Sequence, residues 1–361
     1  MNEPPAASAR PGRFGDGEVF AALDLGTNNC RLLVATPSGG RGFRIVDSYS
    51  RIVRLGEGLS QSGRLGAGAM ERAISALSVC ADKIRRRGAV HVRAVATQAC
   101  RSAANGPQFL AEVEARTGLR LAVISPQEEA RLSVTGCLDL IDVAAKAVLI
   151  LDVGGGSTEL SWLDLRANGL DRRPGQRGLR RPPIAAWLSM PVGVVSLTER
   201  FPHGEAGDVA GFRAMVEAVK AEVGRFTGAE VLRDLFGDGH CHLIGTSGAI
   251  TSLAGLHLGL ARYDRSKVDG LWMTREDCEA VARRLAGLTV AERGAQPCIG
   301  PDRADLVLAG AAILQAVQET WPCQRVRVAD RGLREGLLLS LMARRRRYRR
   351  RPAGVRPGTA S

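Results

Sequence analysis

Three short segments combine glycine with hydroxyl, amide or carboxylate side chains, as phosphate-binding turns do. They are DLGTNN at 24–29, DVGGGSTE at 152–159 and GTSG at 245–248. Glycine lets the backbone approach a ligand closely, and Ser and Thr hydroxyls add donors to phosphate oxygens. A single turn of this kind also occurs in hairpins that bind nothing, but three in succession favour a phosphate site.

Carboxylates accompany these turns. Asp152 and Glu159 flank the GGGST turn, and a hairpin there would aim both at one cation. Mg²⁺ takes oxygen ligands, commonly carboxylates together with water and phosphate. Glu129 follows Ser125 and Pro126, an expected N-cap with proline at the first helical position, so it lies in a first helical turn. Taken alone, Glu129 is also typical of a helix-start acid, and Glu159 of a strand-edge acid.

Apolar strands position the turns. Runs at 19–23 and 31–35 flank the first turn, and runs at 147–151 and 159–163 flank the second, so each pair predicts a hairpin. The third turn follows a strand at 242–244 and precedes a helix, a junction where backbone N–H groups bind anions. The repetition predicts two related α/β halves.

The rest of the chain alternates between predicted helices and strands. Apolar residues at 70, 74, 77, 81 and 84 fall on one face of a helix over 68–87. The same reasoning predicts strands at 90–96, 119–124 and 325–328, and helices at 108–116, 127–141, 275–285, 304–321 and 333–343.

Composition excludes several classes of protein. With 361 residues, 45% of them apolar and 24% charged, the chain is long enough for two domains and is not a disordered protein, a collagen or a small disulfide scaffold. It holds no apolar run long enough to span a membrane. The first 17 residues lack a signal-peptide core, and the eight cysteines form no CxxC pair. We expect a reduced, cytoplasmic protein.

The net charge of +13 is confined to two segments. Residues 344–361 hold eight arginines and no acid, and residues 166–183 hold six arginines against Asp171, which together account for the whole excess. Both are poor in apolar residues and are predicted to be disordered in isolation. The arginines could bind nucleic acid, anionic lipid or a polyanionic substrate, or serve as a solubilising tail. No nucleic-acid-binding module accompanies them, so sequence-specific recognition is not expected.

His240, Cys241 and His242 have the side chains of metal ligands. On a strand, alternation would put both histidines on one face, and the sequence offers no second pair at zinc-finger spacing. We assign no metal to them.

In their order, the three turns resemble the phosphate-binding segments of the actin, sugar-kinase and Hsp70 superfamily. Within it, the sequence is most similar to the exopolyphosphatase and guanosine pentaphosphate phosphohydrolase (Ppx/GppA) family, over roughly residues 20–340. The similarity rests on AALDLGTNNCRLLVA at 21–35, LGEGL at 55–59, VRAVATQACRSAANG at 92–106, ISPQEEARL at 124–132, LDVGGGSTEL at 151–160, GTSG at 245–248 and GLREGLL at 332–338. ATQACR, EEAR and DVGGGSTE together are highly specific.

The resemblance implies an α/β fold of two ribonuclease H-like (actin-like ATPase) lobes with a cleft between them. The first lobe would span residues 18–142 and include the helix at 333–343, and the second would span 143–332 with the basic loop 166–183. A disordered arm at 1–17 and a disordered tail at 344–361 would flank them. Longer family members carry a further helical domain, and members often act as dimers, so a homodimer is one option.

The same resemblance assigns the site. Glu129, the second glutamate of EEAR, would be the base that activates water, and Asp152 and Glu159 would serve catalysis and bind Mg²⁺ or Mn²⁺. The residues expected to bind phosphoryl oxygens are Asp24, Gly26, Thr27, Asn28, Arg101, Gly154, Gly155, Gly156, Ser157, Gly245, Thr246, Ser247 and Gly248. Where the family usually has SGxEEAR, this chain has Pro126, which removes one N–H donor.

The activity implied is release of terminal orthophosphate from inorganic polyphosphate. Hydrolysis of the 5′-phosphate of guanosine pentaphosphate uses the same residues, and the sequence does not separate the two. A non-catalytic sensor of polyphosphate or the guanosine alarmone is disfavoured because a sensor needs no water-activating base. An ATP-dependent sugar kinase is disfavoured by EEAR.

Overall fold

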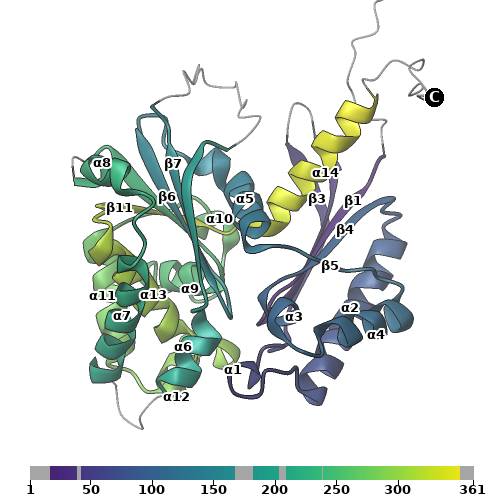
Figure 1. The fold of residues 1–361 in the computed structure, drawn as a ribbon, viewed down its shortest axis with the longest axis horizontal. Coiled ribbons are helices and arrows are strands. Elements are labelled where there is room, and N and C mark those ends of the chain that lie inside the picture. Colours follow the sequence, from purple (N-terminus) through teal and green to yellow (C-terminus); the bar gives the residue numbers. More distant parts are fainter. Residues whose placement is uncertain (1–16, 39–41, 167–181, 203–208, 238, 350–361) are drawn as a thin grey trace, which may run out of the picture.

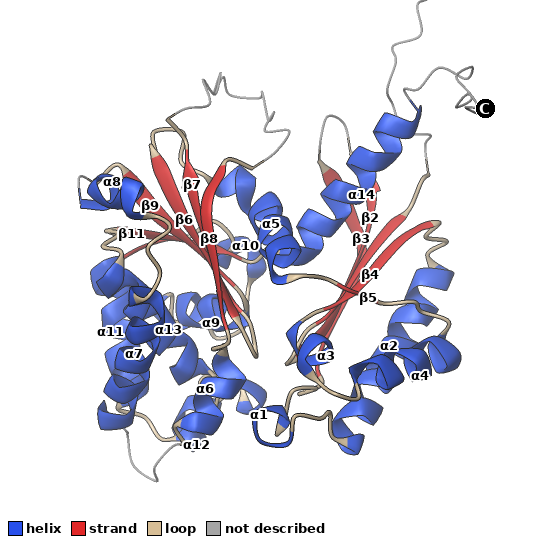
Figure 2. Cartoon of the chain, in the orientation of Figure 1, coloured by secondary structure: helices blue, strands red, loops and turns tan. Residues whose placement is uncertain are grey.

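The computed structural model describes residues 17–38, 42–166, 182–202, 209–237 and 239–349. It forms two lobes side by side, each a β-sheet with helices packed on it (Figures 1 and 2). Within these ranges, no helix is both long enough and apolar enough to cross a membrane.

The first lobe is built on a five-stranded sheet. Its strands are β1 (Phe20–Leu25), β2 (Asn29–Pro37), β3 (Phe43–Ile52), β4 (His91–Ala96) and β5 (Ala122–Val123), in the order β3-β2-β1-β4-β5. One face packs on α2 (Ala67–Arg86) and α4 (Gly106–Thr117) through a buried cluster that includes Leu77 and Phe109. The other face packs on α5 (Pro126–Cys137) and α14 (Leu333–Arg349) through Leu132 and Leu338.

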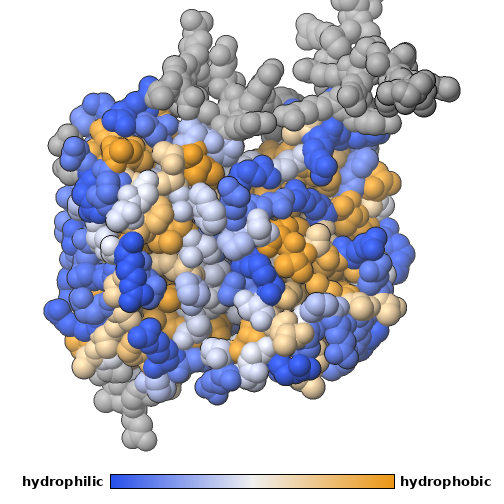
Figure 3. All heavy atoms as spheres, viewed as in Figure 1, coloured by the Kyte–Doolittle hydropathy of each residue, from blue (hydrophilic) through white to orange (hydrophobic). Residues whose placement is uncertain are grey.

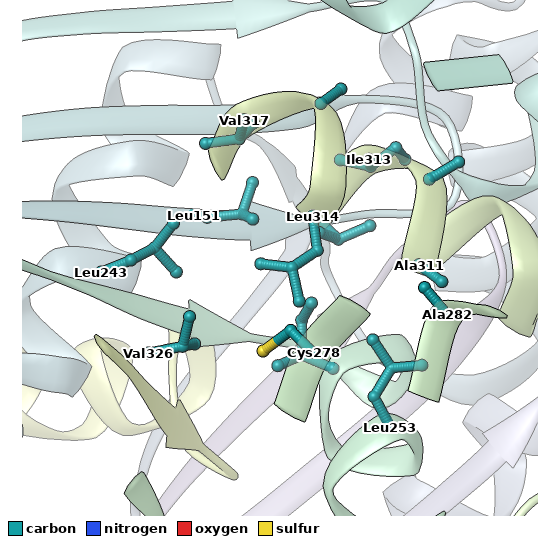
Figure 4. Close-up of a cluster of buried hydrophobic side chains, with 14 of the residues drawn as sticks. Leu151, Leu243, Leu253, Cys278, Ala282, Ala311, Ile313, Leu314, Val317 and Val326 are labelled. Atoms are coloured by element: carbon teal, nitrogen blue, oxygen red, sulfur yellow. The ribbon is translucent and has the colours of Figure 1, made fainter. Parts of the chain in front are cut away.

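The second lobe is built on a six-stranded sheet. Its strands are β6 (Ala147–Val153), β7 (Thr158–Asp164), β8 (Ile184–Met190), β9 (Cys241–Thr246), β10 (Trp272–Thr274) and β11 (Arg325–Ala329), in the order β10-β11-β9-β6-β7-β8. The helices of this lobe are α6 (Val194–Arg200), α7 (Val209–Gly224), α8 (Arg233–Gly237), α9 (Gly248–His257), α10 (Arg265–Val268), α11 (Arg275–Ala286), α12 (Val290–Gly294) and α13 (Val307–Thr320). Figure 4 shows the core, where Leu151 and Leu243 of the sheet lie beside Leu314 of α13 and Cys278 of α11.

The two lobes repeat one arrangement of strands. β1 and β2 form an antiparallel hairpin with β4 parallel to β1, and β6 and β7 form an antiparallel hairpin with β9 parallel to β6. The turn of each hairpin carries one of the glycine-rich segments. The predicted α/β fold of two related lobes is confirmed.

Helices α5 and α14 cross between the two sheets at backbone contact (Figure 1). A Cβ atom added to Gly136 of α5 would lie 2.0 Å from the carbonyl oxygen of Gly332, and one added to Gly336 of α14 would lie 1.9 Å from that of Leu132. Each helix therefore has a glycine at the point where the backbone of the other segment approaches it. The crossing holds the start of α14 against the C-terminal half of α5.

Three predicted elements have clearly different limits in the structure. The helix predicted at 127–141 ends as α5 at Cys137 and is followed by a short 3-10 helix at Leu138–Leu140. The sequence predicts a helix at 333–343 followed by a disordered tail, but α14 continues to Arg349, so residues 344–349 are helical. Arginine is a good helix former, and Arg345 is anchored by an ion pair with Glu18 at 3.1 Å. The predicted strand at 119–124 is reduced to β5, because Leu119 and Leu121 turn into the core from irregular backbone.

Other predictions fall outside the described residues. These are the arm at 1–16, most of the basic loop (167–181) and the tail from 350 onwards. The residue limits given to the two lobes stay predictions.

The helix crossing can be tested by adding one methyl group. Gly336→Ala places Cβ against a backbone oxygen, which only movement of a helix can relieve, and overpacking of this kind costs about 3 kcal/mol of unfolding free energy. Urea denaturation measures the loss. Gly68→Ala in α2 is the matched control, since its Cβ would meet only the end of the Arg72 side chain at 3.7 Å, and it should leave stability equal or raise it by about 0.5 kcal/mol. Equal stabilities of the two variants would contradict a tight crossing.

Candidate active site

The glycine-rich turns of both lobes line one cavity of about 130 Å³. β1 and β6 both end at it, and α5 and α14 both begin at it. The predicted site residues on its wall are Asp24, Gly26, Thr27, Asn28, Glu129, Asp152, Gly154, Gly155, Gly156, Ser157, Glu159, Thr246, Ser247 and Gly248. Arg101 and Gly245 lie behind that wall. The structure thus brings together side chains that are more than 200 residues apart in sequence.

The first two turns touch each other across the lobes. A Cβ atom on Gly155 would lie 3.0 Å from Cβ of Thr27 and 3.1 Å from the backbone nitrogen of Asn28, and one on Gly156 would lie 2.9 Å from Oγ1 of Thr27. Only glycine allows this approach. The close packing leaves a polar, backbone-lined surface at the cavity.

Asp152 and Glu159 are direct partners in the β6–β7 hairpin. Residues paired across strands project to one face of a sheet, so both carboxylates face the same region. Ser189 of β8 donates its hydroxyl hydrogen to Oε1 of Glu159 at 2.9 Å. Burial, followed by the charge of Asp152, raises the pKa of Glu159 to about 7. Burial also raises the pKa of Asp152. The pair is held where a cation would relieve the repulsion.

Asp24 is the direct partner of Arg31 in the β1–β2 hairpin. Burial raises the pKa of Asp24 to about 6, and the positive charges of Arg31 and Arg334 oppose that rise. Its Oδ1 atom is buried and has no hydrogen-bond partner among the described residues. The carboxylate therefore keeps an acceptor for a ligand of the cavity.

Glu129 and Glu128 occupy consecutive positions in the first turn of α5 but face different surroundings. Glu129 is 9% exposed and lines the cavity, whereas Glu128 forms an ion pair with Arg93 of β4 and does not line the cavity. Burial, followed by the charges of Glu159 and Asp24, raises the pKa of Glu129 well above its usual range. The helix start thus places one buried carboxyl group with a raised pKa at the cavity.

Arg101 of α3 (Gln98–Ser102) contacts Glu129 and not the cavity. Its Nη1 donates to Oε2 of Glu129 at 3.3 Å and to the carbonyl oxygen of Ile124 at 2.7 Å, and its Nη2 donates to the side chain of Gln98 at 2.8 Å. These bonds orient Glu129. A direct contact between Arg101 and phosphate stays a prediction.

The third turn has strained backbone. Ser247 caps α9 with φ 125° and ψ 174°, a region occupied almost only by glycine. Its Oγ accepts from the backbone N–H of Ala249 at 3.2 Å. The hydroxyl of Thr246 donates to the carbonyl oxygen of Arg331 at 2.6 Å, so it is engaged within the protein.

Four arginines to which the sequence motifs give no role also line the cavity. They are Arg31, Arg303, Arg331 and Arg334. Arg31 could have been found from its pairing with Asp24 in the predicted hairpin, and Arg334 from its place in GLREGLL. Arg303 ends a short 3-10 helix (Pro301–Arg303), and no pattern in the sequence distinguishes it from other arginines. Together they provide the positive charge that a polyanion in this cavity would need.

The fold and the cavity define a two-lobed α/β protein of the actin-like kind, with carboxylates, arginines and glycine-rich turns facing one another between the lobes. The model of the Ppx/GppA phosphatase family matches residues 33–345. The chain belongs to that family.

Curated relatives and solved structures agree with this placement. Exopolyphosphatase 2 of Mycobacterium tuberculosis is 30% identical over 336 residues, covering 89% of this chain and 98% of the relative. A guanosine-5′-triphosphate,3′-diphosphate pyrophosphatase of Aeromonas hydrophila is 28% identical over 90% of this chain, which spans only 59% of that relative. The crystal structure of the Aquifex aeolicus Ppx/GppA family member is similar with a TM-score of 0.70 at 27% identity, covering 91% of this chain and 98% of that one.

Relief of the strain at Ser247 should stabilise the protein. Ser247→Gly allows the same φ and ψ without a Cβ atom and should raise the unfolding free energy by about 1 kcal/mol, since glycine replaces serine at an N-cap at little cost. Denaturant unfolding measures the change. Ser78→Gly, inside α2, should instead lower stability by about 0.5 kcal/mol. A loss of stability in Ser247→Gly would show that the hydroxyl matters more than the strain.

Proposed function

We propose that this protein is a divalent-metal-dependent phosphatase that releases terminal orthophosphate from inorganic polyphosphate. The observation that carries the proposal is the placement of Glu129 at the cavity that also holds the Asp152–Glu159 pair and both glycine-rich turns. A base, a cation site and donors for phosphate oxygens are the parts that phosphoryl transfer to water requires.

The position of each residue in the cavity indicates its role. Backbone N–H groups of the turns and the guanidinium groups of Arg31, Arg303 and Arg334 would hold the phosphoryl oxygens. Glu129, oriented by Arg101, would accept a proton from water as the water oxygen attacks the terminal phosphorus and the bridging oxygen leaves with the chain. The raised pKa of Glu129 makes it a stronger base than an exposed glutamate.

The carboxylates fit Mg²⁺ or Mn²⁺. Asp152 and Glu159 project from one hairpin to one face, their pKa values are raised by burial, and Asp24 nearby keeps an unpartnered oxygen. Among the described residues no three His, Cys, Asp or Glu side chains come together as a metal site, so water and phosphate oxygens would complete the coordination, as is common for Mg²⁺. Asp152 and Glu159 would bind the cation, and it would neutralise charge on the phosphoryl group.

We favour polyphosphate as the substrate by similarity, since the exopolyphosphatase is 30% identical over 336 residues and the guanosine-5′-triphosphate,3′-diphosphate pyrophosphatase is 28% identical over 329. Guanosine pentaphosphate is the second candidate substrate. A cytoplasmic location and a homodimer stay predictions.

Loss of the base tests catalysis. Glu129→Gln keeps the shape of the side chain but removes its ability to take a proton, and should lower orthophosphate release from polyphosphate by about 10³-fold. Glu128→Gln, the adjacent glutamate outside the cavity, should stay within about twofold of wild type. Release measured in parallel from guanosine pentaphosphate decides the substrate. Tight binding of either compound without release by the wild type would instead favour a sensor.

Metal binding can be tested without turnover. Mg²⁺ should raise Tm by about 5 °C at pH 8 and by less at pH 6, because the pKa values of about 7 for Glu159 and about 6 for Asp24 let protons compete with the metal as pH falls. Thermal unfolding with and without Mg²⁺ measures the shift. Asp152→Asn should abolish it, and Glu128→Gln should keep it. An equal shift in all three proteins would place the metal elsewhere.

A further inference from the structure

A group of polar contacts joins the lobes beside the cavity but outside its wall. On the first lobe it comprises Arg54, Gly58 and Ser60, around α1 (Leu59–Ser62), and on the second Glu199 of α6, Asp302 and Asp305. We call this group the interlobe clamp. α1 and α6 lie next to each other between the lobes in Figure 1.

Arg54 makes the strongest contact of the clamp. Its Nη1 donates to Oδ2 of Asp305 at 2.8 Å and its Nη2 to Oδ1 at 3.1 Å, a two-bond geometry that fixes orientation as well as distance. Nη2 also donates to the carbonyl oxygen of Asp302 at 3.2 Å. The two side chains are 35% and 28% exposed. An isolated surface ion pair contributes little, but this one is bidentate, partly shielded and part of a network.

A second contact supports the first. The carboxylate of Glu199 accepts from the backbone N–H of Gly58 at 3.0 Å with one oxygen and from the hydroxyl of Ser60 with the other. Thr198, the preceding residue of α6, donates its hydroxyl hydrogen to the carbonyl oxygen of Asp305 at 3.3 Å. The clamp therefore holds α6, α1 and the segment before α13 together.

Each side of the clamp is hydrogen-bonded to a phosphate-binding turn. On the first lobe, the backbone N–H of Arg54 donates to the carbonyl oxygen of Asn28 at 3.1 Å, and that of Gly56 donates to Thr27 at 2.9 Å. On the second, the N–H groups of Val194 and Val195 donate to the carbonyl oxygens of Gly154 and Gly155 at 3.0 and 2.8 Å. Movement of the clamp would move both turns.

The backbone conformation of Arg54 also supports a structural role. Its φ of 47° is left-handed, and among the described residues only Ser247 shares a positive φ without being glycine. Strain in a residue other than glycine persists where surrounding contacts impose it. Here the bonds to Asn28 on one side and Asp305 on the other impose it.

Asp305 connects the clamp to the cavity. It lies between Arg303 and Leu306, both of which line the cavity, whereas Arg54 and Asp305 do not. We propose that Arg54 is a positioning residue, which through Asp305 holds the Thr27–Asn28 turn and the Arg303 segment at the separation that a bound phosphoryl group bridges. The inference rests on the proposed phosphatase function.

The interlobe clamp determines how much of the free energy of substrate binding is needed to bring the two lobes together. With the clamp intact, substrate meets a preformed cavity; without it, binding must first bring the lobes together. Saturating substrate would restore the closed form, so the loss falls on KM more than on kcat.

Arg54→Asn is the decisive variant. Asparagine adopts the left-handed conformation readily, so the turn should be kept while the side chain becomes too short to reach Asp305. KM for polyphosphate should rise about tenfold, with kcat within about twofold. Asp305→Asn should have the same effect, and the double variant should cost no more than either single one. Arg116→Ala, which breaks an exposed bidentate pair with Glu71 within the first lobe, should leave KM unchanged.

Small-angle X-ray scattering of the same proteins provides a readout apart from activity. Arg54→Asn should have a larger radius of gyration than wild type and Arg116→Ala should not. Unchanged KM and unchanged radius in Arg54→Asn, with an active wild type, would overturn the clamp. Additive losses in the double variant would overturn it too. A wild type that hydrolyses neither polyphosphate nor guanosine pentaphosphate would instead overturn the proposed function, while the scattering still decides the clamp.

Discussion

The site depends on the backbone contact between α5 and α14. Gly136 and Gly336 let the two helices cross without side chains between them, and both helices start at the cavity. Glu129 lies in the first turn of one and Arg334 in the first turn of the other. Because neither helix can slide without a collision of backbone atoms, the carboxylate of Glu129 and the guanidinium group of Arg334 keep a fixed separation. The glycine-rich turns are held in place because each follows a strand whose apolar side chains pack in the core of its lobe.

Charge explains why this arrangement suits an anionic substrate and a metal. Asp24, Glu129, Asp152 and Glu159 share one buried region, and burial raises the pKa of each. Buried like charges cost free energy unless cations approach them. Arginines around the cavity offset part of that cost, and a divalent ion with a polyphosphate end would complete the balance. Elsewhere on the face drawn in Figure 3, hydrophilic and hydrophobic residues are interspersed on both lobes.

The sequence predicted the parts of this account that are local. Strand, glycine turn and strand repeat within short segments, so both hairpins and the fold class followed from pattern, and the motifs supplied the family. β3 and β8 had no such signal, because they are edge strands with mixed polar and apolar residues, and β8 directly follows the basic loop. α7 was missed although its sequence carries the helical pattern, with buried residues at 212, 215, 216, 219 and 223. Arg303, the contact of Arg101 with Glu129 and the pairing of Arg54 with Asp305 could not be predicted, because they depend on how distant segments meet. The extent of α14 depended on the anchoring of Arg345 by Glu18.

In the proposed reaction the cavity directs water to a terminal phosphorus, with Glu129 as the base. Hydrolysis of polyphosphate in water enriched in oxygen-18 tests it most directly. The released orthophosphate should carry the label, and the shortened chain should not. Label in the chain, or release of unlabelled orthophosphate, would contradict it, because the attack would then occur at another phosphorus or without water from this site.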